Sequence, residues 1–273
     1  MLTGRTAVVR VLRIFGLLFP LFRFVEPLSA QEHDGTLRIL CYNIHHGEGA
    51  DGRLDLARQA AVIRSCDPDL VALQEVDDRT MRTGQVDQTA ELAKQTGLYG
   101  RFVHQLDFEG GRYGQAVLSK YPLSEVTVHW LPGMPDRERR VAGAVSVQID
   151  NCRLLFVTTH LHHNNAEFRR AQAVRLNEIF ASEVESVDTF VILAGDLNAT
   201  PESQPIRILA GQWQSATEGL SDTLTFPADK PERQLDYIFL HPPSRVRVKS
   251  VKVLDEPLAS DHRPLLAEVS ETH

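Results

Sequence analysis

The sequence predicts an α/β fold in which mixed β-sheets carry helices on their outer faces. Short apolar runs typical of buried strands alternate with helical patterns from Thr36 onward, and strands follow one another more directly in the second half. No Pro/Ser-rich linker or long block of like charge divides this part of the chain, which favours one domain. With 273 residues, of which 42% are hydrophobic, the chain is long enough to bury a large core without disulfides.

The expected strands are apolar runs, several of them apolar on both faces as in a buried sheet. They span residues 37–42, 70–74, 115–118, 141–149, 153–158, 190–194, 234–240, 246–253 and 264–269. The cysteines are an odd number, and we interpret them as core residues rather than as a disulfide framework. They are Cys41, Cys66 and Cys152.

Three helices are expected between these strands, each marked by apolar residues at helical spacing. The marker residues are Leu56, Ala60 and Ile63; Val86, Ala90 and Ala93; and Ala173, Leu176 and Phe180. Gly97 is placed to end the second helix, and Asn164 or Asn165 is placed to cap the start of the third.

The first 30 residues have the pattern of a secretory signal peptide. Three arginines precede an apolar stretch at 14–22, and small residues at 28–30 offer a cleavage site. The apolar stretch is far shorter than the roughly 20 residues that a membrane span needs. We expect residues 1–30 to be a signal peptide or N-terminal anchor and residues 31–273 to be the catalytic domain. A signal peptide would export the protein to the periplasm or the cell exterior. The alternatives are that an uncleaved N-terminus anchors the protein in the membrane, or that the start of the reading frame is assigned too far upstream.

The charge of the chain limits its partners. The formal net charge is −7, and residues 1–30 hold four Arg and one Glu, so the remainder carries 25 basic and 35 acidic residues, near −10. This balance disfavours affinity based on neutralising many nucleic-acid phosphates, and no stable nucleic-acid complex is expected. Carboxylates also recruit divalent cations, so phosphate handled through a metal remains compatible with the charge. No feature indicates an obligate protein partner.

Polar residues end four of the expected strands. Asn43, Glu75, His160 and Asp196 each follow an apolar run. In layered α/β folds this edge of the sheet binds ligands, so we expect the four side chains to converge. Any one of them alone is more simply explained as a strand-end cap or a turn residue. The complete set is harder to explain in that way.

Three further polar residues extend this set. Asp236 lies in the expected strand 234–240, where a buried carboxylate needs a histidine, a metal or backbone donors as partner. Asp261 and His262 belong to a Ser-Asp-His triplet just before the last strand. A ligand set rich in oxygen and poor in Cys suits Mg²⁺, with Mn²⁺ as second choice.

Six short motifs, taken in order, resemble those of the endonuclease/exonuclease/phosphatase superfamily over about residues 36–269. They are Asn43, Gln74-Glu75, Thr159-His160-Leu161, Gly195-Asp196-Leu197-Asn198, Leu235-Asp236-Tyr237 and Ser260-Asp261-His262. The resemblance implies a four-layer α/β sandwich of the deoxyribonuclease-like type, with two packed mixed β-sheets flanked by helices. It also implies an Mg²⁺-dependent phosphoesterase that most simply hydrolyses a phosphodiester by metal-assisted in-line attack of water.

The resemblance assigns metal ligands by position in the motifs. Glu75 resembles the principal Mg²⁺ ligand, with Asn43 and Asp261 near the metal. This chain departs from several relatives at two places: Gln115 replaces an Asn, and His45 stands where some relatives carry a second metal-proximal Asp. The second departure favours a site for one metal rather than two.

The resemblance also implies catalytic roles. Asp196 resembles the residue that orients or deprotonates the attacking water, and Asn198 resembles a donor to a phosphate oxygen. Asp236 and His262 resemble the family's carboxylate–imidazole pair, which would present a protonated imidazole to the phosphate. His160 resembles a second phosphate-facing histidine, and either this residue or water on the metal could protonate the leaving oxygen.

The sequence indicates the class of reaction more narrowly than the substrate. Arg79, Arg82, Tyr113 and Arg140 are candidate substrate contacts, although a solvated surface role is the simpler reading of any single arginine. The substrate is expected to be a phosphate ester that is a small molecule, a lipid headgroup or a nucleic acid. A nuclease needs a basic groove, and a sphingomyelinase-like enzyme needs exposed apolar residues, for which Trp130 in an expected loop is a candidate.

Two readings from other classes compete with this one. A non-catalytic phosphate- or membrane-binding module of the same fold would have lost key catalytic residues, and these are present. A zinc hydrolase could use His160, His162 and His163. Neighbouring histidines on an extended loop cannot easily face one metal, so a solvated loop is favoured for the last two.

Overall fold

The computed structural model describes residue 1 and residues 35–134, 138–149, 152–181 and 189–272. The chain divides into two units, Met1–Asp34 and Gly35–His273. The expected leader at residues 1–30 lies, apart from Met1, outside the described residues. All the helices and strands given below belong to the second unit. Among the described residues, no helix combines the length and apolar character needed to cross a membrane.

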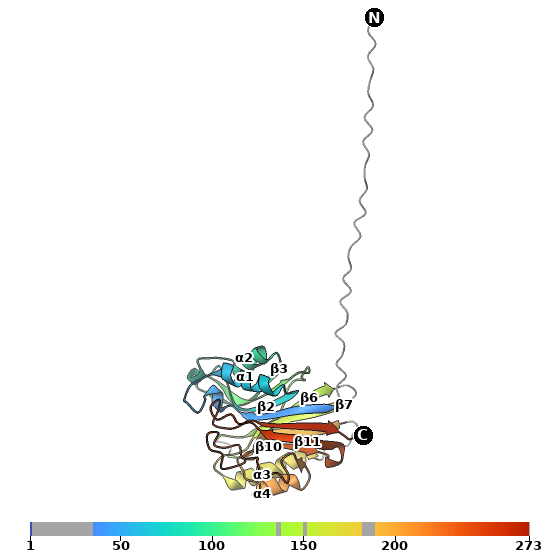
Figure 1. The fold of residues 1–273 in the computed structure, drawn as a ribbon. Helices are drawn as coiled ribbons and strands as arrows, with labels where there is room; N and C mark the ends of the chain where they lie inside the picture. The colour runs from blue at the N-terminus through green and yellow to red at the C-terminus, as the bar shows by residue number, and fades with distance from the viewer. Residues whose placement is uncertain (2–34, 135–137, 150–151, 182–188, 273) are drawn as a thin grey trace. The chain divides into compact units, whose positions relative to one another are not determined.

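The strands of the described residues form two six-stranded mixed sheets, which lie face to face (Figure 1). The first sheet has the order β11-β12-β1-β2-β4-β3, with β1 (Thr36–Asn43), β2 (Leu70–Asp78), β3 (Tyr99–Phe108), β4 (Gly111–Ser119), β11 (Val246–Val253) and β12 (Leu265–Glu271). The second has the order β5-β6-β7-β8-β10-β9, with β5 (Thr127–Trp130), β6 (Val141–Ile149), β7 (Cys152–His160), β8 (Thr189–Asp196), β9 (Gln214–Ser215) and β10 (Asp236–His241). Each sheet contains one parallel pair, β1 with β2 and β7 with β8.

Helices cover the outer face of each sheet (Figure 1). The first sheet carries α1 (Leu56–Cys66) and α2 (Gln88–Thr96), and the second carries α3 (Ala166–Leu176), a π-helical turn (Asn177–Ala181) and α4 (Gln204–Ala210). Short 3-10 turns occupy His45–Gly47, Met81–Thr83 and Pro243–Arg245. The order helix, sheet, sheet, helix confirms the predicted four-layer α/β sandwich.

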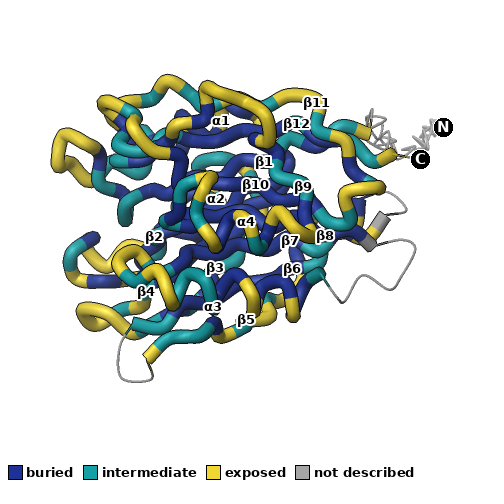
Figure 2. The backbone as a smooth tube through the Cα atoms, turned by 90° about the horizontal axis from the view of Figure 1, so that it is seen from below, coloured by how far each residue is buried: buried dark blue, intermediate teal, exposed yellow. Residues whose placement is uncertain are grey.

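The central strands are apolar on both faces because each face packs on a different layer. In β1, Ile39 and Cys41 pack into the core between the two sheets, whereas Leu40 and Tyr42 pack under α1 with Ile63. All of these side chains are fully or almost fully buried, and the buried segments lie in the centre of the molecule in Figure 2. This arrangement explains the continuous apolar runs in the sequence.

The helix boundaries follow the expected caps. Asn165 caps α3, since its side chain accepts a hydrogen bond from the backbone N–H of Phe168. Gly97 ends α2 in a left-handed conformation with φ of 75°. Val86 lies before α2 rather than inside it, because Asp87 is the N-cap and accepts from the third residue of the helix.

Several elements were not expected from the sequence. Strands β3, β5 and β9 and the short helix α4 have no expected counterpart, and the strand expected at 234–240 begins at Asp236. Strands β3, β5 and β9 are edge strands, which do not need apolar residues on both faces. Trp130 belongs to β5 and not to a loop, with its ring exposed and the Arg139 guanidinium 4.6 Å from the ring centroid.

The cysteine prediction holds where the structure describes the side chains. Cys41 and Cys66 are buried free thiols, in β1 and at the end of α1. The side chain of Cys152 lies outside the described residues.

Candidate functional site

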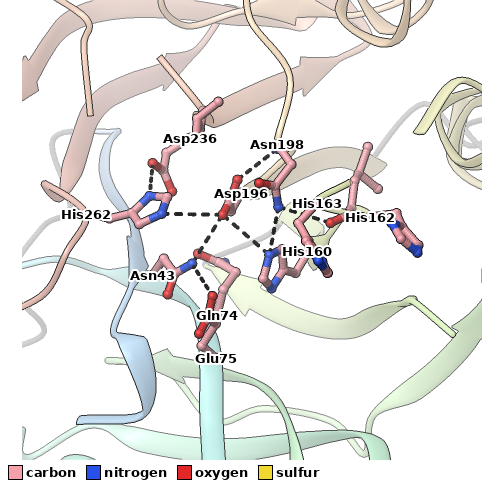
Figure 3. Close-up of polar contacts among 12 residues, drawn as sticks. Asn43, Gln74, Glu75, His160, His162, His163, Asp196, Asn198, Asp236 and His262 are labelled. Carbon is pink, nitrogen blue, oxygen red and sulfur yellow. Dashed lines mark hydrogen bonds and ion pairs between the residues drawn. The ribbon is translucent and has the colours of Figure 1, made fainter. Parts of the chain in front are cut away.

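The two parallel strand pairs end at the same edge of the sandwich and deliver polar side chains there. Asn43 ends β1, and His160 and Asp196 end the neighbouring strands β7 and β8, where they are paired in register. The Asn43 Nδ2 donates to Asp196 Oδ2 at 3.2 Å, a bond that joins the first sheet to the second. Figure 3 shows Asp196 between His262 and His160, with Asn43 and Glu75 next to it. The expected convergence of these residues is therefore observed.

Glu75 reaches the site through an irregularity in β2. The register between β2 and β4 shifts between Gln74 and Val76, so Glu75 is the extra residue of a β-bulge and has φ of 57°. Its Oε1 accepts a hydrogen bond from Asn43 Nδ2 at 3.1 Å. The bulge turns the carboxylate into the cavity described below.

Asp196 is held by the turn that follows it. The backbone N–H of Asn198 donates to Asp196 Oδ1 at 2.8 Å, and Asn198 has φ of 48°. The Asn198 Nδ2 donates to the carbonyl of Leu161 at 3.1 Å and lies 2.9 Å from His160 Nε2. Because that nitrogen is a donor, His160 Nε2 is the acceptor and carries no proton.

Asp236 and His262 form the expected carboxylate–imidazole pair. The Asp236 Oδ2 lies 2.8 Å from His262 Nδ1, both side chains are buried, and the ring of Phe226 packs against the imidazole. The His262 Nε2 points to Asp196 Oδ2 at 3.7 Å. Ser260 fixes the Ser-Asp-His segment to the first sheet, since its hydroxyl donates to the backbone carbonyl of Asn43 at 2.8 Å.

The three buried titratable groups differ in protonation. Burial alone would lower the pKa of His262, but the carboxylates of Asp236 and Asp196 raise it to about 10. Burial raises the pKa of Asp196 to about 7, against the opposing effect of His262. Burial lowers the pKa of His160 well below its ordinary value, and the charges of Arg140 and His262 lower it further. At neutral pH the site therefore holds a charged His262, a neutral His160 and an Asp196 near its midpoint.

These residues face a cavity of about 490 Å³, a size suited to a small ligand. Its lining comprises Glu75, Arg82, Leu106, Phe108, Tyr113, Glu138, Arg140, His160, His163, Asp196, Asn198, Phe226, Arg233, Leu235, Asp261 and His262. It includes nine of the twelve predicted site residues, all except Asn43, Arg79 and Asp236. Asn43 and Asp236 lie outside the lining and each holds one lining residue by a hydrogen bond. Asn43 bonds to Glu75, and Asp236 bonds to His262.

Arg140 is the most informative of the predicted substrate contacts. Its side chain is 3% exposed, and its Nη2 lies 3.3 Å from both Glu138 Oε1 and His163 Nδ1. Its Nε and Nη1 are buried and have no hydrogen-bond partner. A buried guanidinium with two unsatisfied nitrogens in a polar cavity indicates an anion-binding position.

The other predicted substrate contacts divide between the cavity and the surface. Arg82 lines the cavity, where the buried Asp77 holds it through two hydrogen bonds of 2.7 and 2.8 Å and its guanidinium lies over the rings of Phe108 and Tyr113. Arg79 does not line the cavity: it is 60% exposed and pairs with Asp78 and Asp87. These two carboxylates hold the Arg79 guanidinium at the surface.

The structure adds lining residues that carry no motif in the sequence. They include Leu106, Phe108, Glu138, Phe226 and Arg233. Strand β3 and the segments before β6 and β10 supply most of them, and β3 was itself not expected. Gln115, by contrast, is buried away from the cavity, where its Nε2 donates to the carbonyl of Val141 at 3.3 Å.

Two groups of described residues bring three metal-binding side chains within reach of one ion. Asp196, Asp236 and His262 form one group, and His45, His46 and Glu75 form the other; in each, three ligand atoms lie within 4.8 Å of one another. The first group could hold a metal ion. Its short His262–Asp236 hydrogen bond, however, already uses the imidazole and one carboxylate, which favours an ion pair at that position.

Of the predicted metal residues, Glu75 belongs to the second group. Glu75 and Asp261 both line the cavity. Asn43 turns its amide nitrogen toward Glu75, while its Oδ1 accepts from the backbone N–H of His45 at 3.0 Å. Asn43 thus orients Glu75 through its amide nitrogen, and its Oδ1 keeps a second lone pair, so a metal-binding role of Asn43 stays a prediction. The donor set of carboxylates fits a divalent cation.

The histidines of the zinc alternative are arranged differently. His162 and His163 stack on each other with ring centroids 5.3 Å apart, and His163 Nδ1 is occupied by Arg140. Among the residues that the structure describes, neither takes part in a group of three metal-binding side chains. This geometry gives no support to a zinc site made from these residues together with His160.

The fold and the site together define a deoxyribonuclease-like α/β sandwich with a buried Asp/His cluster at the strand ends. The chain matches the model of the Endonuclease/Exonuclease/phosphatase family over residues 40–262, so it belongs to this family.

Solved structures show the same fold. A family protein from Beutenbergia cavernae has a TM-score of 0.68 at 24% identity, covering 86% of this chain and 72% of that one. One from Bacteroides vulgatus has a TM-score of 0.71 at 22% identity, covering 87% and 99%. A mannosyl-6-phosphatase from Bacteroides thetaiotaomicron has a TM-score of 0.70 at 18% identity, covering 87% and 100%. A search of curated protein sequences gives no match.

Proposed function

We propose that the protein hydrolyses a small phosphate ester, with a phosphodiester as the first candidate, by attack of water assisted by a divalent cation. The observation that carries this proposal is the buried guanidinium of Arg140. Arg140 lines the cavity that also contains Glu75, Asp196 and His262, and two of its guanidinium nitrogens are buried without a partner. A phosphate is the ligand whose oxygens best match a guanidinium.

The cavity supplies cationic groups for the phosphate from its own residues. His262 is held as an imidazolium by Asp236 behind it, and Arg140 is permanently charged. Both line the cavity, so both can stabilise the negative charge that builds up on phosphate oxygens during attack. Because Asn198 Nδ2 already donates to the Leu161 carbonyl and to His160, we assign it the further role of orienting His160.

Asp196 is the group best suited to take a proton from the attacking water. A general base works best when its pKa lies near the working pH, and burial brings the pKa of Asp196 to about 7. Its position is fixed by hydrogen bonds to both oxygens, from Asn198 N to Oδ1 and from Asn43 Nδ2 to Oδ2.

Glu75 and Asp261 are the residues that would hold the cation in this function. Both are carboxylates that line the cavity, and oxygen ligands of this kind suit Mg²⁺ or Mn²⁺. When bound, the cation would neutralise charge on the phosphate and raise its susceptibility to attack.

The proposal is tested by assaying the full chain against bis-p-nitrophenyl phosphate, p-nitrophenyl phosphate, plasmid DNA and sphingomyelin. Each assay is run with Mg²⁺, with Mn²⁺ and with EDTA. The monoester is included because one structurally similar protein is named a mannosyl-6-phosphatase. We expect turnover that EDTA abolishes and that is highest for a small substrate. Absence of hydrolysis of all four substrates with either metal would refute the proposal.

Arg140→Gln and Arg79→Gln form a matched pair of variants for this assay. Loss of a buried charged contact to phosphate costs about 2–4 kcal/mol, so Arg140→Gln should lower kcat/KM by roughly 30-fold or more. Arg79 is exposed and lies outside the cavity, so its variant should retain wild-type kinetics. Equal kinetics of the two variants would refute the proposed contact between Arg140 and the substrate.

A further inference from the structure

We propose that His45, His46 and Glu75 form a binding site for a transition-metal ion such as Mn²⁺, Co²⁺ or Zn²⁺. The two histidines form the 3-10 turn (His45–Gly47) that follows β1, and Glu75 lies on the bulge of β2. One ring nitrogen of each histidine and one oxygen of Glu75 lie within 4.8 Å of one another. The inference deepens the proposed function, since Glu75 belongs to both.

One ring nitrogen of each histidine lacks a hydrogen-bond partner. The Nδ1 atoms of His45 and His46 are buried and have no hydrogen-bond partner. Buried polar atoms of native proteins are almost always satisfied, so two adjacent exceptions need an explanation. A metal ion placed between them and Glu75 would satisfy both at once.

The second nitrogen of His46 has the environment that a metal ligand usually has. Its Nε2 lies 3.6 Å from Glu48 Oε2. Histidines that bind metals through one nitrogen usually direct the other N–H to a carboxylate or carbonyl, which fixes the tautomer and the ring orientation. With its Nε2 directed to Glu48, His46 has Nδ1 free to bind the ion.

The backbone holds these three residues in place despite unfavourable conformations. His45, His46 and Glu75 have φ of 45°, 43° and 57°, in the left-handed region that non-glycine residues rarely adopt. Two contacts fix the turn from outside: Gln88 Nε2 donates to the His46 carbonyl at 2.7 Å, and Gln59 Nε2 donates to the carbonyl of residue 44 at 2.7 Å. The ligands are thus positioned before any ion binds.

The ligand types predict which ions this site prefers. Mg²⁺ favours oxygen ligands, whereas imidazole nitrogen suits Mn²⁺, Co²⁺ and Zn²⁺ increasingly well. Two imidazoles and one carboxylate therefore favour a transition metal. In this chain His45 and His46 would shift the preference of the Glu75 site away from Mg²⁺.

The test is a titration of the metal-depleted full chain with Co²⁺, followed by the visible absorption of the ion. We expect absorption bands typical of nitrogen ligation and no displacement of Co²⁺ by equimolar Mg²⁺. His45→Gln and His46→Gln should each weaken Co²⁺ binding by at least about tenfold. His104→Gln is the matched control, because His104 lies on β3, pairs with Asp107 and does not line the cavity, and it should bind Co²⁺ like the wild type.

Pulsed EPR of Mn²⁺ bound to the unmutated chain provides a measurement that does not depend on variant folding. Coupling to imidazole nitrogen supports the inference, and its absence overturns it. Unchanged Co²⁺ affinity in both histidine variants, or equal competition by Mg²⁺, also overturns it. These readouts are separate from catalysis: nitrogen ligation without ester hydrolysis would refute the proposed function alone, and Mg²⁺-supported hydrolysis without nitrogen ligation would refute this inference alone.

Discussion

Replacement of Asp236 by Asn should make the stability of the protein much less dependent on pH between 6 and 10. In the folded protein the pKa of His262 is raised from 6.5 to about 10, with Asp236 and Asp196 as the causes that outweigh burial. A group whose pKa is raised on folding contributes stability that is complete below its unfolded pKa and is lost as pH rises through the folded value. The contribution of His262 is therefore complete near pH 6 and lost by about pH 10.

The size of this effect follows from the geometry of the pair. Each pKa unit corresponds to about 1.4 kcal/mol, so a rise from 6.5 to about 10 is on the order of 5 kcal/mol. Breaking a buried ion pair by removing one partner costs about 3–5 kcal/mol, which agrees. In Asp236→Asn a neutral amide replaces the carboxylate that raises the pKa of His262. Burial, which lowers this pKa, then has less opposition, so His262 should lose its proton at a much lower pH.

The assay is urea unfolding of the wild type and Asp236→Asn at pH 6, 8 and 10. We expect the variant to be less stable by roughly 3–5 kcal/mol at pH 6 and the difference to shrink as pH rises. Asp255→Asn is the control: Asp255 is 86% exposed in its ion pair with Arg263, so its loss should cost less than about 1 kcal/mol. A difference for Asp236→Asn that is equal at pH 6 and pH 10 would refute the reasoning.

Four further predictions concern a tightly packed glycine, a helix cap, cation binding and the N-terminal leader. Gly195→Ala should destabilise the fold by about 3 kcal/mol or more, since its Cβ would lie 2.0 Å from a carbonyl oxygen of β7; Gly133→Ala, with open space around it, should be near neutral in the same urea experiment. Asn165→Ala should cost about 1 kcal/mol through loss of the α3 cap, measured by thermal unfolding. A divalent cation at 100 times its Kd should add about 2.7 kcal/mol to the free energy of unfolding, and Glu75→Gln should abolish this gain. Mass spectrometry of protein recovered outside the cytoplasm should show a chain lacking the first 30 residues, and an intact chain inside the cell would contradict export.

The sequence allowed the interior of the fold to be predicted better than its edges. Central strands such as β1 and β8 are buried on both faces, so their residues form apolar runs that stand out. Strand β3 mixes polar and apolar residues without a long apolar run and lies at the edge of its sheet, and β9 has only two residues. These elements depend on pairing with a neighbour, which a single sequence does not display.

The polar residues of the site were predictable for a related reason. A carboxylate or imidazole at the end of an apolar run is conspicuous, and the parallel pairing of β1 with β2 and of β7 with β8 brings such ends together. Substrate contacts were harder to predict because arginines occur throughout the surface. Arg79 and Arg140 look alike in the sequence, and only the packing shows that the first is exposed and the second is buried with unpaired nitrogens.

The role of Asn43 illustrates how the two sheets become one site. Its Nδ2 donates both to Glu75 on the first sheet and to Asp196 on the second, and a single amide thereby holds two carboxylates close together. Two carboxylates at close range repel each other when both are ionised, and Glu75 is among the groups that raise the pKa of Asp196. Burial is the largest cause of the raised pKa of Asp196, and the nearby Glu75 carboxylate adds to it. Under the proposed function, the same carboxylates would attract a cation to the space beside Glu75. Acid–base function and metal affinity would then both depend on the junction of the two sheets that Asn43 holds together.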